Sequence, residues 1–574
     1  MAKIESSSID WLKQNHLVYE QENDIYNLCN PNIFDGKDRS AFCKAIGGLE
    51  HSVEFRRLKD TKQVYSCPDH RVRDRLTHSL EVSNICKQLV SYFFTKAEEY
   101  NILEADSYQE VKDLMYELSE FSCLAHDIGH PPFAHTTERH LDKVLPKRFF
   151  DSNVQNLRIL CKLTPESFGK NSYPIACIDA SVKKKHFGYI STHKFKQREE
   201  YILEKISKEL GTFIEKPIDY EDSSVKKEYF YEKTNKLIHT LNKSVKNKAR
   251  YKEIDFIRHP VAYFMEASDD ISYLSSDIED ALSRGNIDVP FLEEKLLDLI
   301  LELHGLFNSD ESELTYTKDE PLAAPIIILQ KDTLTEDKIT LPTLDDIKKN
   351  YGEYFSRNIN DNELSKIKTL ILKIFIGKAK WSIVQIIKYA KNSPVENSKP
   401  TDKEFLKKLP QWFHVFSLEE LKSKVSEPGN LLYFSGKNNL STSNDSKDFG
   451  QILMNFKKSV FNDHLFKVYD VNINNQVSKE VLSHYLESII PSTLDDARSK
   501  AGSMPDKYRS QVYKLLNDEV YLNGDTFDMI LDVFIDYLIS LSDMDVLNKV
   551  ARLEEVTKLV SETGHTRSKL VNGH

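Results

Sequence analysis

The chain carries a dense group of histidine and carboxylate side chains around one forced bend. The stretch FSCLAHDIGHPPFAHTTERH, from Phe121 to His140, contains the adjacent pair His126-Asp127. Adjacent His and Asp side chains at a helix end can both reach one cation, because imidazole supplies nitrogen and carboxylate supplies oxygen. Gly129 and the two prolines after it interrupt the helix. We therefore take this stretch as the candidate centre of the protein and expect further ligands from elsewhere in the chain.

A second pair of polar side chains follows the bend, on a helix that resumes there. His135 and Glu138 lie one turn apart, so the carboxylate can fix the tautomer of the imidazole and hold it protonated. Such a pair is suited to act as a general acid toward a leaving oxygen.

Two distant helices are expected to complete a metal site. Apolar residues recur at helical spacing around His78, which puts this residue near a helix start. Further on, Asp269, Tyr273 and Asp277 stand four residues apart and share one face of a helix. The predicted donor set is His78, His126, Asp127 and a carboxylate of the 269–277 face. This set suits Mn, Mg, Fe, Co or Zn, and such an ion polarises a phosphoryl group and lowers the pKa of bound water.

Composition excludes several classes of protein. The formal net charge of −11 over 574 residues argues against a chain that coats nucleic acid, which needs clustered Lys and Arg. No apolar run approaches the roughly 18 residues that span a bilayer, and the N-terminus lacks a signal-peptide pattern. The seven cysteines form no CxxC pair, which suits a reducing compartment. We expect a cytoplasmic protein without a membrane partner.

Periodicity predicts an all-α protein with a small irregular or β insertion around residues 306–345, where a PIIIL run follows prolines. The lysine-rich excursion has two interpretations, a solvated helical segment or a source of phosphate contacts. Gly-rich phosphate loops are absent, so any nucleotide chemistry would rely on a metal and side chains. The predicted organisation is an N-terminal segment 1–37, a catalytic core 38–300 with the lysine-rich excursion 183–255, the insertion 301–346, a helical C-terminal region 347–560 and a disordered tail 561–574.

Five motifs between residues 38 and 285 occur in the order of a known family. They read EFRRLKDTKQVY, RDRLTHSLEVS, HDIGHPPFAHTTE, FDSNVQNLRIL and HPVAYFMEASDDISYLSSDIEDAL. Together they resemble the HD-domain deoxyguanosinetriphosphate triphosphohydrolase family, to which the metazoan sterile-alpha-motif/HD-domain dNTPase is related. A later segment, DYLISLSDMDVL, resembles the family's DYISGMTD segment. This resemblance implies a helical HD-domain fold.

The resemblance also implies an activity. It is hydrolysis of dGTP, and of other dNTPs, to a deoxynucleoside and inorganic triphosphate by water attack on the α-phosphorus, with one divalent metal per subunit. Family members form dimer-based tetramers or hexamers, and some are regulated by a nucleotide or by single-stranded DNA.

Roles for individual residues follow from the same resemblance. The metal ligands would be His78, His126, Asp127 and Asp269, the last preferred over Asp270 because only Asp269 keeps the four-residue register with Tyr273 and Asp277. His135 would protonate the departing 5′ oxygen while Glu138 orients it. His130, which stands where many bacterial members carry Asn, would join the phosphate-binding or proton-transfer group. The implied substrate contacts are Arg75, Asn153, Lys183 and Lys185 for the phosphates, and Gln63, Tyr273 and Asp277 for the deoxyribose.

Two alternatives remain open at this point. One is another HD-type nucleotide phosphohydrolase, against which the set of Gln63, Tyr273 and Asp277 argues, because it is suited to a deoxyribose pocket. The other is a nucleic-acid-binding regulator with a vestigial HD site that uses the lysine-rich residues 183–255. Product analysis separates the first alternative, and DNA binding that survives metal removal would favour the second.

Overall fold

The computed structural model of the protein describes part of the chain. The described residues are 41–61, 63, 73–102, 108–144, 150, 152–160, 173, 175–181, 183, 259–308, 345, 348–349, 361–392, 431–432, 449–465, 480–517 and 524–552.

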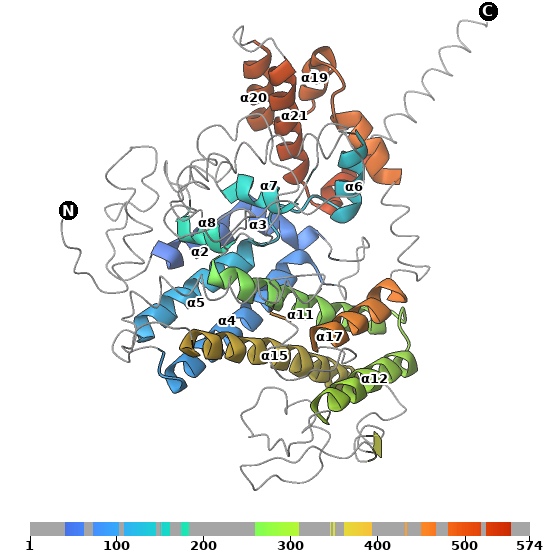
Figure 1. The fold of residues 1–574 in the computed structure, drawn as a ribbon. Helices are drawn as coiled ribbons and strands as arrows, with labels where there is room; N and C mark the ends of the chain where they lie inside the picture. Colours follow the sequence, from blue (N-terminus) through green and yellow to red (C-terminus); the bar gives the residue numbers. More distant parts are fainter. Residues whose placement is uncertain are drawn as a thin grey trace, which may run out of the picture.

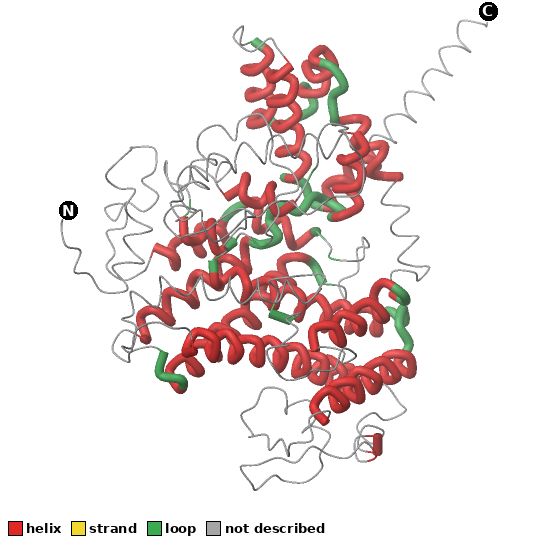
Figure 2. The backbone as a smooth tube through the Cα atoms, viewed as in Figure 1, coloured by secondary structure: helices red, strands yellow, loops and turns green. Residues whose placement is uncertain are grey.

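Within these residues the protein is all-α (Figure 2), as predicted. Helix accounts for 83% of the described residues, and no strand occurs among them. Residues 309–344, which hold most of the predicted β insertion, lie outside the described ranges. No helix in those ranges is long and apolar enough to cross a bilayer.

Most of the described residues belong to the helices that Figure 1 draws along the chain. In chain order they are α2 (Ala41–His51), α3 (Val53–Arg56), the 3₁₀ turn η3 (Arg57–Asp60), α4 (Arg75–Glu99), α5 (Tyr108–Ala125), α6 (His135–Val144), α7 (Ser152–Arg158), α8 (Ile175–Ala180), α11 (Pro260–Ser283), α12 (Val289–Asn308), α15 (Asp361–Asn392), α17 (Phe449–Lys457), the π-helical turn η6 (Lys458–Asn462), α19 (Leu494–Ala501), α20 (Asp506–Leu516) and α21 (Gly524–Ile539). Residues 480–489 and 543–552 are also helical.

The core is built around α11. This helix packs against α4, α5, α8 and α15, and its residues from Val261 to Met265 are fully buried. A helix that is apolar on most sides is typical of the centre of a large core. Figure 1 places α4, α5, α11 and α15 in one body, with α19, α20 and α21 standing at the opposite end of the view and α6 and α7 between the two. The segment around Gly129, which leads into α6, therefore lies between the body formed by α4, α5, α11 and α15 and the group formed by α19, α20 and α21.

Local sequence determines where α4 and α11 begin. The carboxylate of Asp74 accepts a hydrogen bond from the backbone N–H of Thr77 at 2.8 Å, which makes Asp74 the N-cap of α4. Pro260 is the first residue of α11, a position that tolerates its missing N–H. The chain leaves α11 through Gly285, whose φ of 70° is left-handed. The N-cap places His78 in the first turn of α4.

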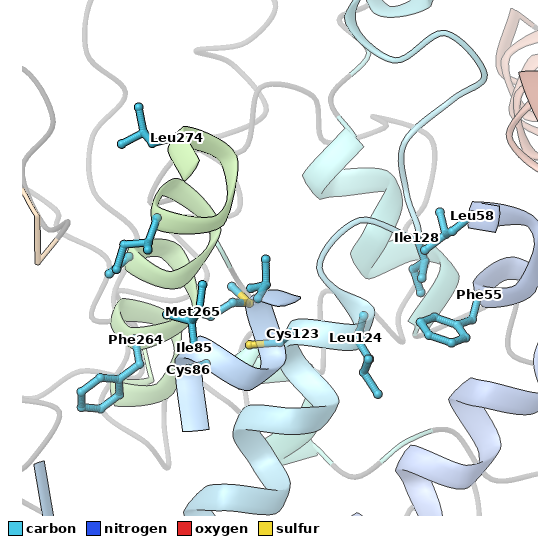
Figure 3. Packing of buried hydrophobic residues seen from close by; sticks show 14 of the residues in the cluster. Phe55, Leu58, Ile85, Cys86, Cys123, Leu124, Ile128, Phe264, Met265 and Leu274 are labelled. Carbon is cyan, nitrogen blue, oxygen red and sulfur yellow. The ribbon is translucent and has the colours of Figure 1, made fainter. Parts of the chain in front are cut away.

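Apolar side chains surround the place where α4, α5 and α11 meet (Figure 3). The picture labels two groups, one with Ile85, Cys86, Cys123 and Met265, and the other with Phe55, Leu58 and Ile128. Both groups belong to the same continuous hydrophobic core. Cys123 precedes the histidine-aspartate pair and Ile128 directly follows it, so apolar packing holds the chain on both sides of the pair.

Candidate metal centre

Three buried side chains converge at the start of α4 and the end of α5. His78 comes from α4, while His126 and Asp127 follow Ala125, the last residue of α5. One ligand atom from each lies within 4.8 Å of the ligand atoms of the other two. We call His78, His126 and Asp127 the metal cluster, because two imidazoles and a carboxylate are a donor set for a divalent cation.

The orientation of His126 fits a bound cation. Its Nδ1 lies 2.6 Å from the carbonyl oxygen of Cys123, which can only accept a hydrogen bond, so Nδ1 carries the proton. The Nε2 atom is buried, makes no hydrogen bond within the described residues, and lies 3.3 Å from Oδ1 of Asp127 and 3.4 Å from Oδ1 of Asp269. A lone pair that faces two carboxylate oxygens needs a positive charge between them. A divalent metal would supply that charge, as would a proton on Nε2, because Asp127 and Asp269 raise the pKa of His126 against the effect of burial.

Asp269 and Asp270, adjacent on α11, have different partners. Asp269 directs Oδ1 toward Nε2 of His78 at 2.8 Å, and its other oxygen forms an ion pair with Lys183. Asp270 pairs with Nζ of Lys457 at 3.0 Å. Of the two carboxylates considered from the sequence, Asp269 is therefore the one beside the metal cluster.

Neighbouring charges hold the carboxylates of the site ionised. Burial would raise the pKa of Asp127, but His126, His130 and Arg75 hold it well below its ordinary value. Burial likewise opposes ionisation of Asp269, and its pKa is held low, above all by Lys183. Two ionised carboxylates beside two imidazoles make this a site that attracts a cation.

Residues 128–134, which we call the bend, are held by a buried arginine. Arg57 donates from Nη2 to the carbonyl oxygens of Ile128 at 2.7 Å and His130 at 2.8 Å, and from Nη1 to that of Leu541 at 3.4 Å. Burial lowers the pKa of Arg57 to about 10, which leaves it charged at neutral pH. One guanidinium thus binds backbone carbonyl groups of the bend and of Leu541, which lie more than 400 residues apart in the chain.

The end of the bend has an unusual backbone. Phe133 and Ala134 have φ angles of 56° and 44°, left-handed values that cost non-glycine residues free energy. The backbone N–H of Phe133 donates to Oδ1 of Asp543 at 2.8 Å. This charged hydrogen bond helps to hold the conformation that leads into α6.

A glycine lets α7 approach the bend. A Cβ atom added at Gly129 would overlap the carbonyl oxygen of Ser152 and the backbone nitrogen of Asn156, and would lie 2.8 Å from the Cα of Asn156. Only glycine fits where the start of α7 crosses the chain so closely.

The sequence has relatives among curated proteins, although no family model matches it. It is 29% identical over 342 residues to a deoxyguanosinetriphosphate triphosphohydrolase-like protein of Aliivibrio salmonicida, a match that covers 52% of this chain and 69% of the relative. A similar protein of Aliivibrio fischeri is 31% identical over 271 residues, covering 43% of this chain and 54% of the relative. The deoxyguanosinetriphosphate triphosphohydrolase of Cronobacter sakazakii is 28% identical over 273 residues, covering 44% of this chain and 52% of the relative.

This chain is a distant homologue of the HD-domain deoxyguanosinetriphosphate triphosphohydrolases. The family resemblance stated from the motifs is thereby confirmed. The matches to the Aliivibrio fischeri and Cronobacter sakazakii proteins span about half the length of those relatives.

The residues expected to handle protons in a triphosphohydrolase lie in the bend and on α6, which follows it. His130 has Nδ1 3.2 Å from Oδ1 of Asp127 and Nε2 3.3 Å from Oγ of Ser152. Burial and Arg75 lower the pKa of His130 to about 4, although Asp127 opposes the shift. Glu138 accepts a hydrogen bond from the backbone N–H of Ser152 at 3.2 Å. The side chain of His135, the first residue of α6, lies outside the described part of the structure, so its pairing with Glu138 stays a prediction.

The expected phosphate contacts have different surroundings. Arg75 is buried and donates from Nη1 to Oδ2 of Asp127 at 2.6 Å, so it directly orients a predicted metal ligand. Lys183 pairs with Asp269, and Asn153 lies half-buried on α7. Lys185 lies outside the described residues.

The expected deoxyribose contacts include two polar groups that lack partners within the described ranges. These are the buried atoms Oε1 of Gln63 and Oδ2 of Asp277. Burial and the nearby Asp280 raise the pKa of Asp277 well above its ordinary value, which favours a protonated carboxyl that can donate. Tyr273 stacks on Phe461 of η6, with ring centroids 4.9 Å apart. This contact between Tyr273 and a residue of the C-terminal region was not predicted from the sequence.

Sequence reasoning also missed the residues that hold the bend. Arg57 was visible only as part of the first family-like motif, EFRRLKDTKQVY, and Asp543 only as part of the later segment DYLISLSDMDVL. Neither position carries a local signal of its partner, since Phe133 and Asp543 are 410 residues apart. A buried arginine could have been suspected from its place among apolar residues, Phe55 and Leu58.

Proposed function

We propose that this protein is a metal-dependent dNTP triphosphohydrolase, which converts dGTP, and other dNTPs, to a deoxynucleoside and inorganic triphosphate. The observation that carries the proposal is the buried metal cluster, with Asp269 beside it, in a chain homologous to this family. The two imidazoles and two carboxylates fit one divalent ion, and Mn, Mg, Fe, Co and Zn are all compatible with that donor set. When bound, the ion lowers the pKa of a coordinated water and polarises the α-phosphoryl group.

In this proposal the chain's own residues orient the substrate. Arg75, which holds Asp127 at 2.6 Å, contributes positive charge next to the phosphates. Lys183, which pairs with Asp269, would contact a phosphate oxygen instead once a bound metal neutralises that carboxylate. Asn153 and Lys185 provide further phosphate contacts. Tyr273, stacked on Phe461, forms a wall against the sugar where a 2′-hydroxyl would clash.

The 3′-hydroxyl is assigned to the two buried oxygens that make no hydrogen bond within the described residues. Gln63 accepts a hydrogen bond from this hydroxyl through Oε1. Asp277, whose pKa burial and Asp280 raise well above its ordinary value, would donate to it through Oδ2 when protonated. His135, oriented by Glu138, donates the proton to the departing 5′ oxygen. The low pKa of His130 makes it neutral at pH 7, so its role is to accept or relay a proton rather than to carry charge.

Product analysis tests the proposal. Each dNTP is incubated with the protein and Mn²⁺ or Mg²⁺, singly and in mixtures, and the products are separated by anion exchange. Deoxynucleoside and inorganic triphosphate are expected in equal amounts. Release of orthophosphate or pyrophosphate would mean that the chain is another HD-type phosphohydrolase, and acceleration in mixtures would indicate a nucleotide effector. Salt-dependent DNA binding that persists without metal, with no turnover, would favour the regulator with a vestigial HD site.

Adjacent aspartates on α11 provide a matched pair of variants. Asp269→Asn is expected to reduce kcat by at least about 100-fold, because it removes a ligand charge from the metal. Asp270→Asn also breaks an ion pair with a lysine but leaves the site intact, so its activity should stay within about threefold of the parent. Equal losses in both variants would contradict the choice of Asp269 as the ligand.

Assembly completes the proposal. We expect a homo-oligomer, a dimer-based tetramer or hexamer, which light scattering at several protein concentrations would measure with and without nucleotide or single-stranded DNA.

A further inference from the structure

Glu81 lies one turn after His78 on α4 and meets two serines of α11. Oε2 of Glu81 accepts hydrogen bonds from Oγ of Ser272 at 3.2 Å and from Oγ of Ser276 at 2.6 Å. Oγ of Ser272 also lies 3.2 Å from Nδ1 of His78. A continuous line of hydrogen bonds therefore runs from a carboxylate outside the metal cluster to the back of one of its imidazoles.

The charge of Glu81 determines the direction of these bonds. Nε of Arg73 donates to Oε1 of Glu81 at 2.9 Å, and Nζ of Lys368 lies 3.8 Å away. Burial would raise the pKa of Glu81, but the hydroxyl of Ser276 and the charge of Arg73 outweigh it and lower that pKa. An ionised carboxylate can only accept, so the hydroxyl of Ser272 donates to Glu81. Its oxygen is then left to accept from His78.

We propose that Glu81 is a positioning residue that acts through Ser272 to hold His78 with its proton on Nδ1 and the lone pair of Nε2 toward the metal. The inference rests on the proposed function only in requiring that the cluster binds a divalent metal. It gives His78 the same tautomer that the carbonyl of Cys123 imposes on His126. Nε2 of His78 and Nε2 of His126 lie 2.8 Å and 3.4 Å from the same oxygen, Oδ1 of Asp269. A cation that joins these atoms would replace the proton that Nε2 of His78 otherwise shares with that carboxylate.

The two histidines differ in what holds their outer nitrogen. His126 uses a backbone carbonyl, which no substitution removes, whereas His78 depends on two side chains in series. Arg73 also pairs with Glu279 and with Asp280, the latter at 2.6 Å, so Glu81 is part of an ionic group that joins α4 to α11. The position of His78 is thereby linked to the packing of α4 against α11.

The test uses four full-length single variants in two matched pairs, together with the double variant Glu81→Gln/Ser272→Ala. Ser272→Ala removes the bridging hydroxyl, and Ser275→Ala removes a buried hydroxyl of the same helix that, among the described residues, bonds only to backbone oxygens. Glu81→Gln removes the terminal charge, and Glu279→Gln removes a carboxylate that pairs with Arg73 and Lys368 but stands seven residues after Ser272 on α11. Metal-free protein is titrated calorimetrically with Mn²⁺ and with Zn²⁺, without nucleotide, and thermal unfolding is recorded in parallel.

Ser272→Ala and Glu81→Gln are expected to weaken metal binding by about 10- to 100-fold, and the two controls by less than about twofold. Because Glu81 acts through Ser272, the double variant should bind metal no more weakly than the weaker single variant. Metal binding unchanged in Ser272→Ala, equal losses in Ser275→Ala, or additive losses in the double variant would overturn the inference.

Failure of the proposed function would look different from failure of this inference. A protein that binds metal in the expected order of affinities but hydrolyses no dNTP would retain the positioning role of Glu81 and lose the assigned reaction. If the protein hydrolyses dNTPs but Ser272→Ala leaves its metal affinity unchanged, the assigned reaction would stand and the positioning role of Glu81 would be rejected.

Discussion

His126 and Asp127 of the metal cluster directly precede the bend in the chain, but the two regions are held by different kinds of contact. His78 and His126 project from the well-packed ends of α4 and α5, helices that share a continuous apolar core with α11 (Figure 3). The bend adds two apolar side chains to that core, but its backbone is held by single polar groups, Arg57 and Asp543, which bind backbone atoms. The metal cluster depends on the summed burial of many apolar side chains, whereas the backbone conformation of the bend also depends on a few buried hydrogen bonds.

This difference predicts how each region responds to substitution. An apolar core loses stability in proportion to the volume removed and tolerates swaps that conserve volume. A buried hydrogen bond to a backbone carbonyl cannot be partly replaced, because the group left behind has lost both its partner and water. The bend should therefore be the more sensitive region for each atom changed.

The largest effect is expected at Gly129. Gly129→Ala would force α7 away from the bend, because the new Cβ overlaps backbone atoms that have no rotamer to change. We expect a loss of more than about 3 kcal/mol in the free energy of unfolding, the upper end for overpacking, measured by urea denaturation. Gly47→Ala, on α2 with nothing within 4 Å of the added Cβ, should instead gain about 0.5–1 kcal/mol. An unchanged free energy of unfolding in Gly129→Ala would show that α7 does not approach the backbone of Gly129 this closely.

Removal of the buried guanidinium should come next. Arg57→Met keeps the apolar stem but leaves the carbonyl groups of Ile128 and His130 without their donor, at a cost of about 3 kcal/mol in unfolding free energy. The neighbouring Arg56 is exposed, and Arg56→Met should change stability by less than about 0.5 kcal/mol. Denaturation midpoints of the two variants measure the contrast, and equal values would remove the proposed sensitivity of the bend.

A smaller loss is expected at the far end of the chain. Asp543→Ala removes the acceptor for the N–H of Phe133 and should cost about 1–3 kcal/mol. Asp543→Asn keeps an oxygen that can accept and should cost less than half as much. Protection of the Phe133 amide from hydrogen exchange would report the bond directly. If Asn and Ala lower stability equally, the charge of Asp543 matters more than its hydrogen bond.

The smallest effect should come from the packed side of the site. Met265 is fully buried on α11, and Met265→Leu conserves its volume, so the expected loss is below about 1.5 kcal/mol. Metal affinity, titrated as above, should not change. A larger loss at Met265 than at Asp543 would reverse the ranking of the two regions.

Local patterns in the sequence were sufficient for the helices and for the family. Helical spacing of apolar residues predicted α4 and α11. The N-cap Asp74 and the first helical residue Pro260 stand where the chain enters those helices. The motif around His126 and Asp127 pointed to a metal site, and the folded chain brings His78 and Asp269 next to it.

By itself the sequence determined which residue types could bind a metal and which segments would be helical, because both depend on neighbours a few positions apart. The four-residue register already favoured Asp269 over Asp270, and the structure places Asp269 beside the histidines. Only the tertiary structure decided that Glu81 reaches His78 through Ser272 and that Asp543 meets Phe133. The directions of side chains and the pairing of buried polar groups depend on how distant helices pack. No local pattern encodes a hydrogen bond between atoms 410 residues apart.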